Sequence, residues 1–161
     1  MEAKGKKLTG NRLKIIAVLS MTLDHVLWVL YPNYQTDWWI ILLHMLGRLA
    51  APIFWYMAAE GYHYTHNLKK YLLRLFIFSV IGHFAYNFAF EIPFIPFKTS
   101  CFNQTSIIWP LFLGVLGLSI SDSEKLKQWQ KTVLIFILVA LAFPSDWSSP
   151  AFLVILYFGS N

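Results

Sequence analysis

Long apolar stretches, separated by short polar or charged segments, run along the whole chain. They cover residues 13–31, 38–61, 71–90, 107–120, 132–143 and 151–161. An α-helix needs about 20 mainly apolar residues to cross a membrane, with a range of about 17–25. The first three stretches meet this length, the fourth and fifth are shorter, and we expect the sixth to be an incomplete span. The pattern predicts an all-α fold, a polytopic transmembrane bundle of about five to six spans in a single domain, residues 1–161.

The distribution of Lys and Arg predicts the orientation of these spans. All but two of the 13 cations fall in the first 14 residues, at the start of the third stretch, or between the fourth and fifth stretches. If the chain crosses at every stretch, these three places lie on one side of the membrane, and cytoplasmic loops carry the excess of Lys and Arg. We therefore expect a cytoplasmic N-terminus, with residues 1–12 as a basic tail.

The composition agrees with a membrane protein and excludes several other classes. Hydrophobic residues make up 57% of the chain and charged residues 13%, and the mean hydropathy is +0.53. Soluble domains carry about 45–50% apolar and about 25% charged residues. One cysteine excludes a disulfide scaffold. The net charge of +5 comes from cations beside apolar stretches, so we expect the lipid bilayer, and no nucleic acid, as a partner.

Polar side chains inside the first three spans lie at similar depths. At about 1.5 Å per residue, His25, Arg48 and His83 lie roughly 15–18 Å into their spans, near the middle of a hydrocarbon core about 30 Å thick. Ionisable groups at this depth are costly and mark functional sites by default. We expect this layer to face a cavity, and its members are Asp24, His25, His44, Arg48, His83 and Asn87.

The charges in this layer allow two interpretations. Asp24 and Arg48 could form a structural ion pair that joins two helices, or they could serve chemistry next to it. Asp24 and His25 are neighbours and point about 100° apart on a helix, so a group that orients His25 must come from another helix.

A line of residues on the first span suggests a binding path for a phosphate-bearing molecule. Lys14 lies eleven residues before His25, which places both on one helix face roughly 16 Å apart. Lys70 and Arg74 also share a helix face and could bind an anion together with Lys14. The alternatives are a snorkelling Lys14 and the ordinary excess of cytoplasmic cations. The histidine spacing matches no zinc motif, so no metal site is expected.

Several strings of the sequence carry unusual charged residues inside spans. They are LKIIA at 13–17, LDHV at 23–26, GRLAAPIF at 47–54, AEG at 59–61 and HNLKKYLLRL at 66–75, followed by the apolar LFLGVLGL at 111–118. With these strings, nearly the whole chain resembles the TraX family of bacterial integral-membrane proteins. The first half of that family is similar to membrane acyltransferases that use acetyl-CoA.

The resemblance implies a function. It implies an acetyltransferase of the bacterial cytoplasmic membrane that moves an acetyl group from acetyl-CoA to an amine or hydroxyl of an envelope peptide, a pilin-like protein or a glycan. Lys14 and His25 match the related acyltransferases' motif of a basic residue, ten residues and a histidine. The implied roles are phosphate binding for Lys14, Lys70 and Arg74, general base for His25, and stabilisation of the oxyanion or positioning of Asp24 for Arg48.

Two other functional classes stay open. The chain could be a transporter whose midplane charges line a solute or proton path, although it shows no internal repeat. It could also be a structural membrane subunit in which the charges only pair. The alignment of Lys14 with His25, together with the cations at the cytoplasmic edge, favours the enzyme.

Overall fold

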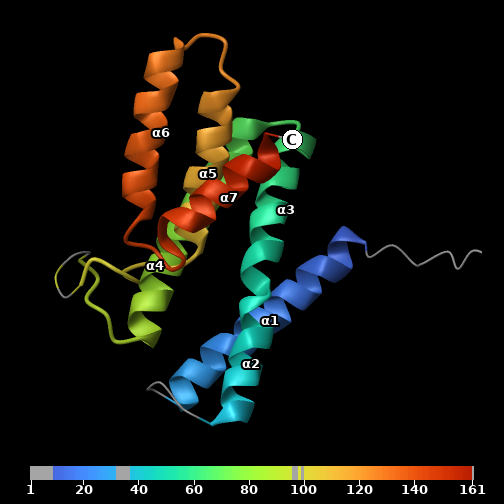
Figure 1. Cartoon of the computed structure of the whole chain (residues 1–161), viewed down its shortest axis with the longest axis vertical. Helices are drawn as coiled ribbons and strands as arrows, with labels where there is room; N and C mark the ends of the chain where they lie inside the picture. Colours follow the sequence, from blue (N-terminus) through green and yellow to red (C-terminus); the bar gives the residue numbers. More distant parts are fainter. Residues whose placement is uncertain (1–8, 32–36, 96–97, 99, 161) are drawn as a thin grey trace, which may run out of the picture. The chain divides into compact units, whose positions relative to one another are not determined.

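The computed structural model describes residues 9–31, 37–95, 98 and 100–160. These residues form seven helices and one isolated β-bridge, between Thr105 and Ser145. The helices are α1 (Gly10–Leu30), α2 (Trp38–Arg48), α3 (Ala50–Tyr64), α4 (Leu68–Ala89), α5 (Ile108–Ser121), α6 (Gln128–Ala142) and α7 (Ser148–Gly159) (Figure 1). The prediction of an all-α fold is confirmed. Most of the expected basic tail, residues 1–8, and Asn161 lie outside the described residues.

Among the described residues, three helical segments are long and apolar enough to cross a membrane: Gly10–Leu30, Trp38–Tyr64 and Leu68–Ala89. They match the first three predicted spans. Much of their apolar surface is uncovered by protein, as at Leu19 and Phe78, which are 65% and 59% exposed. Such surface suits lipid, and the chain is a membrane protein. The last three helices have 12 to 15 residues, so the total number of spans stays a prediction.

The structure refines two of the predicted boundaries. The second apolar segment continues to Tyr64 and is interrupted at Leu49, between α2 and α3. Pro52 explains the interruption, because it has no N–H to donate to the carbonyl of Arg48, four residues earlier. The third segment begins at Leu68 because the side chain of Asn67 caps the helix, accepting a hydrogen bond from the Lys70 backbone N–H at 3.0 Å.

The chain divides into two compact units, residues 1–54 and 55–161, and the boundary falls within α3. In the first unit α1 packs against α2. Gly47 lies at this contact, where a Cβ atom would come within 2.6 Å of the Asp24 Cβ. Small residues let membrane helices approach closely, and here the approach brings the polar middle of α1 against α2.

The second unit is built around α5, which packs against α4, α6 and α7 (Figure 1). Its core includes Leu113, Leu138, Ala142 and Phe152. Backbone hydrogen bonds join the connection before α5 to the connection after α6, from Gln104 N–H to the Pro144 carbonyl and from Asp146 N–H to the Thr105 carbonyl. The two connections therefore form one end of this unit.

Candidate functional site

An acidic and a basic side chain meet at the contact between α1 and α2. His44 Nδ1 lies 2.7 Å from Asp24 Oδ1, and the two side chains are only 18% and 19% exposed. The ring of Trp28, one turn beyond Asp24, lies against His44 with the ring centroids 4.9 Å apart. The carboxylate accepts and the imidazole donates, so Nδ1 carries a proton and Asp24 fixes the orientation of the ring.

The sequence places Asp24 and His44 in one polar layer and allows a pair of Asp24 with Arg48, but it does not predict the contact between Asp24 and His44. Asp24 lies seven residues before Tyr31, the C-cap of α1, and His44 lies seven residues after Asp37, the N-cap of α2. In a helical hairpin, equal distances from the connection mean equal depth. This symmetry was the signal available in the sequence.

His25 also has a defined ring orientation. Its Nδ1 lies 2.8 Å from the backbone carbonyl of Met21, one turn earlier on α1. The expectation that the group orienting His25 must come from another helix is therefore wrong. A carbonyl only accepts hydrogen bonds, so Nδ1 carries the proton. In the neutral ring the lone pair is then on Nε2, the atom that can accept a proton from another molecule. The side chain is half-buried.

The other predicted residues of the first unit are Lys14 and Arg48. Lys14 is exposed on α1, and the helix is continuous between it and His25, as the predicted shared face requires. Arg48 is exposed at the last position of α2, one turn beyond His44. The first unit therefore holds Lys14, Asp24, His25, His44 and Arg48.

Lys70 and Arg74 lie in the second unit. Both are exposed in the first two turns of α4, where their spacing of four residues puts them on one side of the helix. The predicted anion-binding pair is thus geometrically possible. Its participation in one site with Lys14 stays a prediction, because the two units are described separately.

Further along α4, two layer residues bind backbone carbonyls, and one of them, Asn87, departs from the prediction. His83 Nε2 donates to the carbonyl of Phe94 at 2.9 Å, and Asn87 Nδ2 donates to the carbonyl of Pro93 at 3.1 Å. Both side chains hold the chain that follows α4. We expected the whole layer to face a cavity, and Asn87 is instead 1% exposed against this connection.

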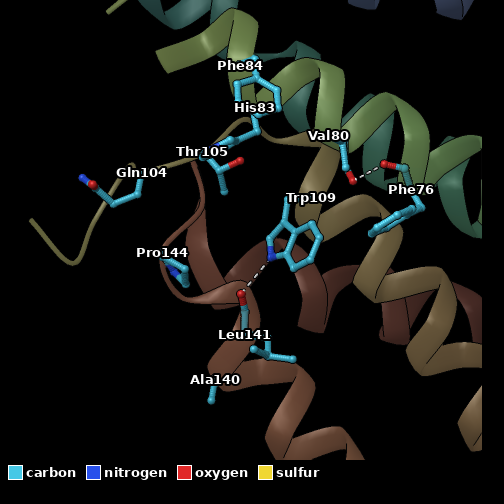
Figure 2. A pocket seen from close by; sticks show the side chains of 11 residues that line it. Phe76, Val80, His83, Phe84, Gln104, Thr105, Trp109, Ala140, Leu141 and Pro144 are labelled. Atoms are coloured by element: carbon cyan, nitrogen blue, oxygen red, sulfur yellow. Dashed lines mark hydrogen bonds between the residues drawn. The ribbon is translucent and has the colours of Figure 1, made fainter. Parts of the chain in front are cut away.

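His83 also lines a pocket of about 460 Å³ in the second unit (Figure 2). Trp109 lines this pocket, and its Nε1 donates a hydrogen bond to the carbonyl of Leu141 at 2.9 Å. The walls come from α4, α5, the end of α6 and the connections before and after these helices: Phe76, Ser79, Val80, His83, Phe84, Gln104, Thr105, Trp109, Ala140, Leu141 and Pro144. The lining is largely apolar and suits hydrocarbon better than a charged group. The described residues contain no cluster of three or more potential metal-binding side chains.

Comparison with known proteins gives a family and two curated relatives. A sequence model of the TraX protein family matches residues 9–159. The chain is 33% identical over 138 residues to a probable fimbrial assembly protein FimC, serogroup H1, of Dichelobacter nodosus, covering 84% of this chain and 55% of that protein. It is 33% identical over 79 residues to the uncharacterized protein RP591 of Rickettsia prowazekii (strain Madrid E), covering 49% of this chain and 27% of that protein. No solved structure matches. The chain thus spans about half of one relative and about a quarter of the other.

Proposed function

The chain belongs to the TraX family, and we propose that it is a membrane-embedded acetyltransferase. In this proposal it moves the acetyl group of acetyl-CoA to an amine or hydroxyl of an envelope peptide, a pilin-like protein or a glycan, in the cytoplasmic membrane of a bacterium. The relative named as a fimbrial assembly protein supports an acceptor in the cell envelope.

The observation that carries the proposal is the set of proton-transfer groups in the first unit. Two imidazoles and a carboxylate lie midway along two packed apolar helices, each with a defined hydrogen-bond partner. Polar groups at this depth are costly. General acid–base catalysis requires positioned groups of this kind, with histidine the most frequent.

The chemistry assigns a role to each residue. His25 Nε2 takes the proton from the acceptor amine or hydroxyl as its nitrogen or oxygen attacks the thioester carbonyl carbon. Arg48 stabilises the negative charge that develops on the carbonyl oxygen. The carbon–sulfur bond then breaks with its electron pair going to sulfur, and the sulfur takes the proton from His25, so the products are the acetylated acceptor and CoA. Asp24 acts through His44, to which it is bonded.

The cations supply binding for the phosphates of acetyl-CoA. Lys14 is exposed on the helix that carries His25, so it can bind a phosphate while a thin arm follows α1. For Lys70 and Arg74 in the second unit, the same role stays a prediction. Their exposed, clustered charge is the donor set that a phosphate requires.

Label transfer from radiolabelled acetyl-CoA tests this function. Membranes with the protein, native lipids and envelope polymers should move label into a peptide, glycan or lipid fraction. His25→Ala should reduce the rate about 10²–10⁴-fold, the contribution typical of a general base. His63→Ala is the matched control, since His63 is exposed and bonds to the Gly159 carbonyl in the second unit.

Three outcomes would contradict the proposal in different ways. Absence of both transfer and acetyl-CoA binding in the wild-type protein would reject the acetyltransferase. Equal loss in the His25 and His63 variants would point to a general effect on folding. Transfer that survives His25→Ala would reject His25 as the base.

A further inference from the structure

The pocket lined by α4, α5 and α6 belongs to the second unit, whereas the proposed general base, His25, belongs to the first. Its volume of about 460 Å³ falls in the range of about 300–1,000 Å³ that is typical of ligand-binding pockets. The described residues that line it include no Lys, Arg, Asp or Glu. A charged ligand therefore has no permanently charged partner here, and an uncharged, apolar ligand fits the lining.

Most polar side chains of the lining bind protein backbone rather than face a ligand. Four of them donate a hydrogen bond to a backbone carbonyl at 2.7–2.9 Å: Ser79, His83, Gln104 and Trp109. Donors that are bonded within the protein do not require a partner from a ligand. The surface that these residues turn toward the pocket is therefore mainly carbon.

One wall of the pocket is a stripe along α4. Its members recur with the spacing of one helix face: Phe76, Ser79, Val80, His83 and Phe84. Counted from Leu68, the first residue of α4, they lie roughly 12–24 Å along the helix at about 1.5 Å per residue. Since α4 is long and apolar enough to cross a membrane, this wall lies at the depth of the hydrocarbon core. Phe76 and Phe84 are 43% and 53% exposed, so the rest of the second unit does not cover the wall.

A hydroxyl group lies at the end of the pocket opposite Phe76. Thr105 belongs to the connection before α5, and in Figure 2 its hydroxyl oxygen points to the side where Trp109 lies. The backbone of Thr105 is held by its bridge to Ser145 and by a hydrogen bond of 2.8 Å from the Asp146 N–H to its carbonyl. A threonine hydroxyl can donate to a carbonyl oxygen. The pocket therefore has an apolar part and one hydroxyl in a defined place.

We propose that this pocket binds one acyl chain of a membrane phospholipid and that the Thr105 hydroxyl donates to the ester carbonyl of that chain. The methylene groups lie along α4 toward Phe76. Apolar contact alone does not hold a lipid in one place, because the surrounding lipid tails are as apolar as the lining. The concave shape and the hydroxyl distinguish the bound lipid from its neighbours. The site does not depend on acetyl transfer.

Photochemical labelling of the full chain in lipid vesicles tests this site without acetyl-CoA. The probe is an ester-linked phosphatidylglycerol with a diazirine in one acyl chain, diluted in unlabelled phosphatidylglycerol. Mass spectrometry compares adducts at the α4 wall with adducts around Leu19 of α1, which is 65% exposed and reports contact with bulk lipid. We expect labelling of the wall about fivefold above this reference, since one hydrogen bond of typical net strength shifts an equilibrium by about that factor. Equal labelling at the two places would reject the site.

Ala140→Phe fills the pocket. Ala140 is an exposed residue of the lining on α6, so a larger side chain can extend into the pocket without entering the core. It should bring labelling of the wall down to the reference. Val133→Phe is the matched control, because Val133 is exposed on the same face of α6, two turns earlier, and does not line the pocket. It should leave the labelling near wild type. Unchanged labelling in Ala140→Phe, or a lower melting temperature without loss of label, would contradict lipid occupancy and indicate that protein covers the pocket.

Thr105→Val keeps the shape of the side chain and removes the hydroxyl. It should lower labelling of the wall about fivefold, whereas Thr105→Ser, which keeps the hydroxyl, should retain it. Melting temperature and elution profile in detergent verify that each variant is folded.

Competition with unlabelled lipids identifies the bonded group. In the wild-type protein the ester-linked lipid should displace the probe about fivefold better than its ether-linked analogue, which lacks the carbonyl. In Thr105→Val the two lipids should compete equally. Equal competition in the wild-type protein would reject the bond from Thr105 to the ester. Displacement by a free fatty acid as efficient as that by the ester-linked lipid would reject a phospholipid as the occupant.

Discussion

Asp24 in the middle of α1 contacts His44 of α2 through its side chain, whereas His83 and Asn87 of α4 contact backbone carbonyls. In the first unit Asp24 binds the side chain of His44. In the second unit His83 and Asn87 bind carbonyls of the segment that follows their own helix. A side-chain pair joins two separate helices and can change its protonation state. The bonds of His83 and Asn87 hold the segment that follows α4, which is a structural role.

A substitution at the close contact between α1 and α2 should affect both stability and acetyl transfer. A Cβ atom at position 47 would lie only 2.6 Å from the Asp24 Cβ, so the side chain in Gly47→Leu forces atoms of α1 and α2 apart. Overpacking typically costs about 1–3 kcal/mol of unfolding free energy. Separation of Asp24 from His44 should also reduce acetyl transfer at least about tenfold. Thermal denaturation in detergent and label transfer measure the two effects.

Gly10→Leu is the control for this substitution, because Gly10 has open space where a Cβ would be. It should leave both quantities near their wild-type values. If Gly47→Leu also leaves thermal stability and the transfer rate near wild type, the close contact between α1 and α2 is not needed to hold Asp24 beside His44.

Asn87→Ala should lower stability without changing the chemistry. Asn87 is 1% exposed, and loss of its side chain leaves the Pro93 carbonyl without this donor. The expected decrease in the free energy of unfolding is about 1–3 kcal/mol. Transfer per folded molecule should stay within about twofold of wild type. Gln128→Ala, at an exposed position, is the control for loss of an amide. A catalytic defect in Asn87→Ala would break the contrast between the two units.

The same substitution at three histidines sharpens the contrast. His83→Phe removes one hydrogen bond, worth about 0.5–1.5 kcal/mol, and should leave the transfer rate within about twofold. His25→Phe should lower the rate at least about 10²-fold, and His44→Phe, which removes the partner of Asp24, should also lower it. Initial rates normalised to folded protein measure this, and a comparable loss at His83 would extend the chemistry to the second unit.

The smallest effect is expected at the exposed end of α1. Lys14→Gln should weaken acetyl-CoA binding up to about fivefold, because an exposed ion pair contributes about 0–1 kcal/mol. Arg12→Gln is the matched control, since Arg12 is also exposed and lies about 200° around the helix from Lys14. The difference in Kd should shrink in high salt. Equal weakening by both substitutions would indicate a general effect of charge.

The helical fold could be predicted from the sequence because helices that face lipid require long runs of apolar residues. The first three spans follow from length and hydropathy alone, and the break at Leu49 follows from Pro52. The contact between Asp24 and His44 could not be obtained in this way. It depends on how α1 and α2 are rotated about their axes, which depth does not determine.

The role of α4's polar residues also escaped prediction. His83 and Asn87 share the depth of the first-unit residues, but their partners are backbone carbonyls. Every residue except the last carries such a carbonyl, so the sequence does not mark the ones that turn toward a helix. The catalytic and cofactor-binding roles of His25, Asp24, Arg48, Lys14, Lys70 and Arg74 stay predictions.

The central position of α5 has a consequence for the order of assembly during synthesis. Its buried residues pack against a helix made before it, α4, and against two made after it, α6 and α7. Phe152 and Ile155 of α7 fill the space beside Gly117 and Gly114 of α5. The second unit therefore cannot complete its core while the ribosome is still making α6. Until α7 has emerged, α5 must be sheltered by lipid or by the insertion machinery.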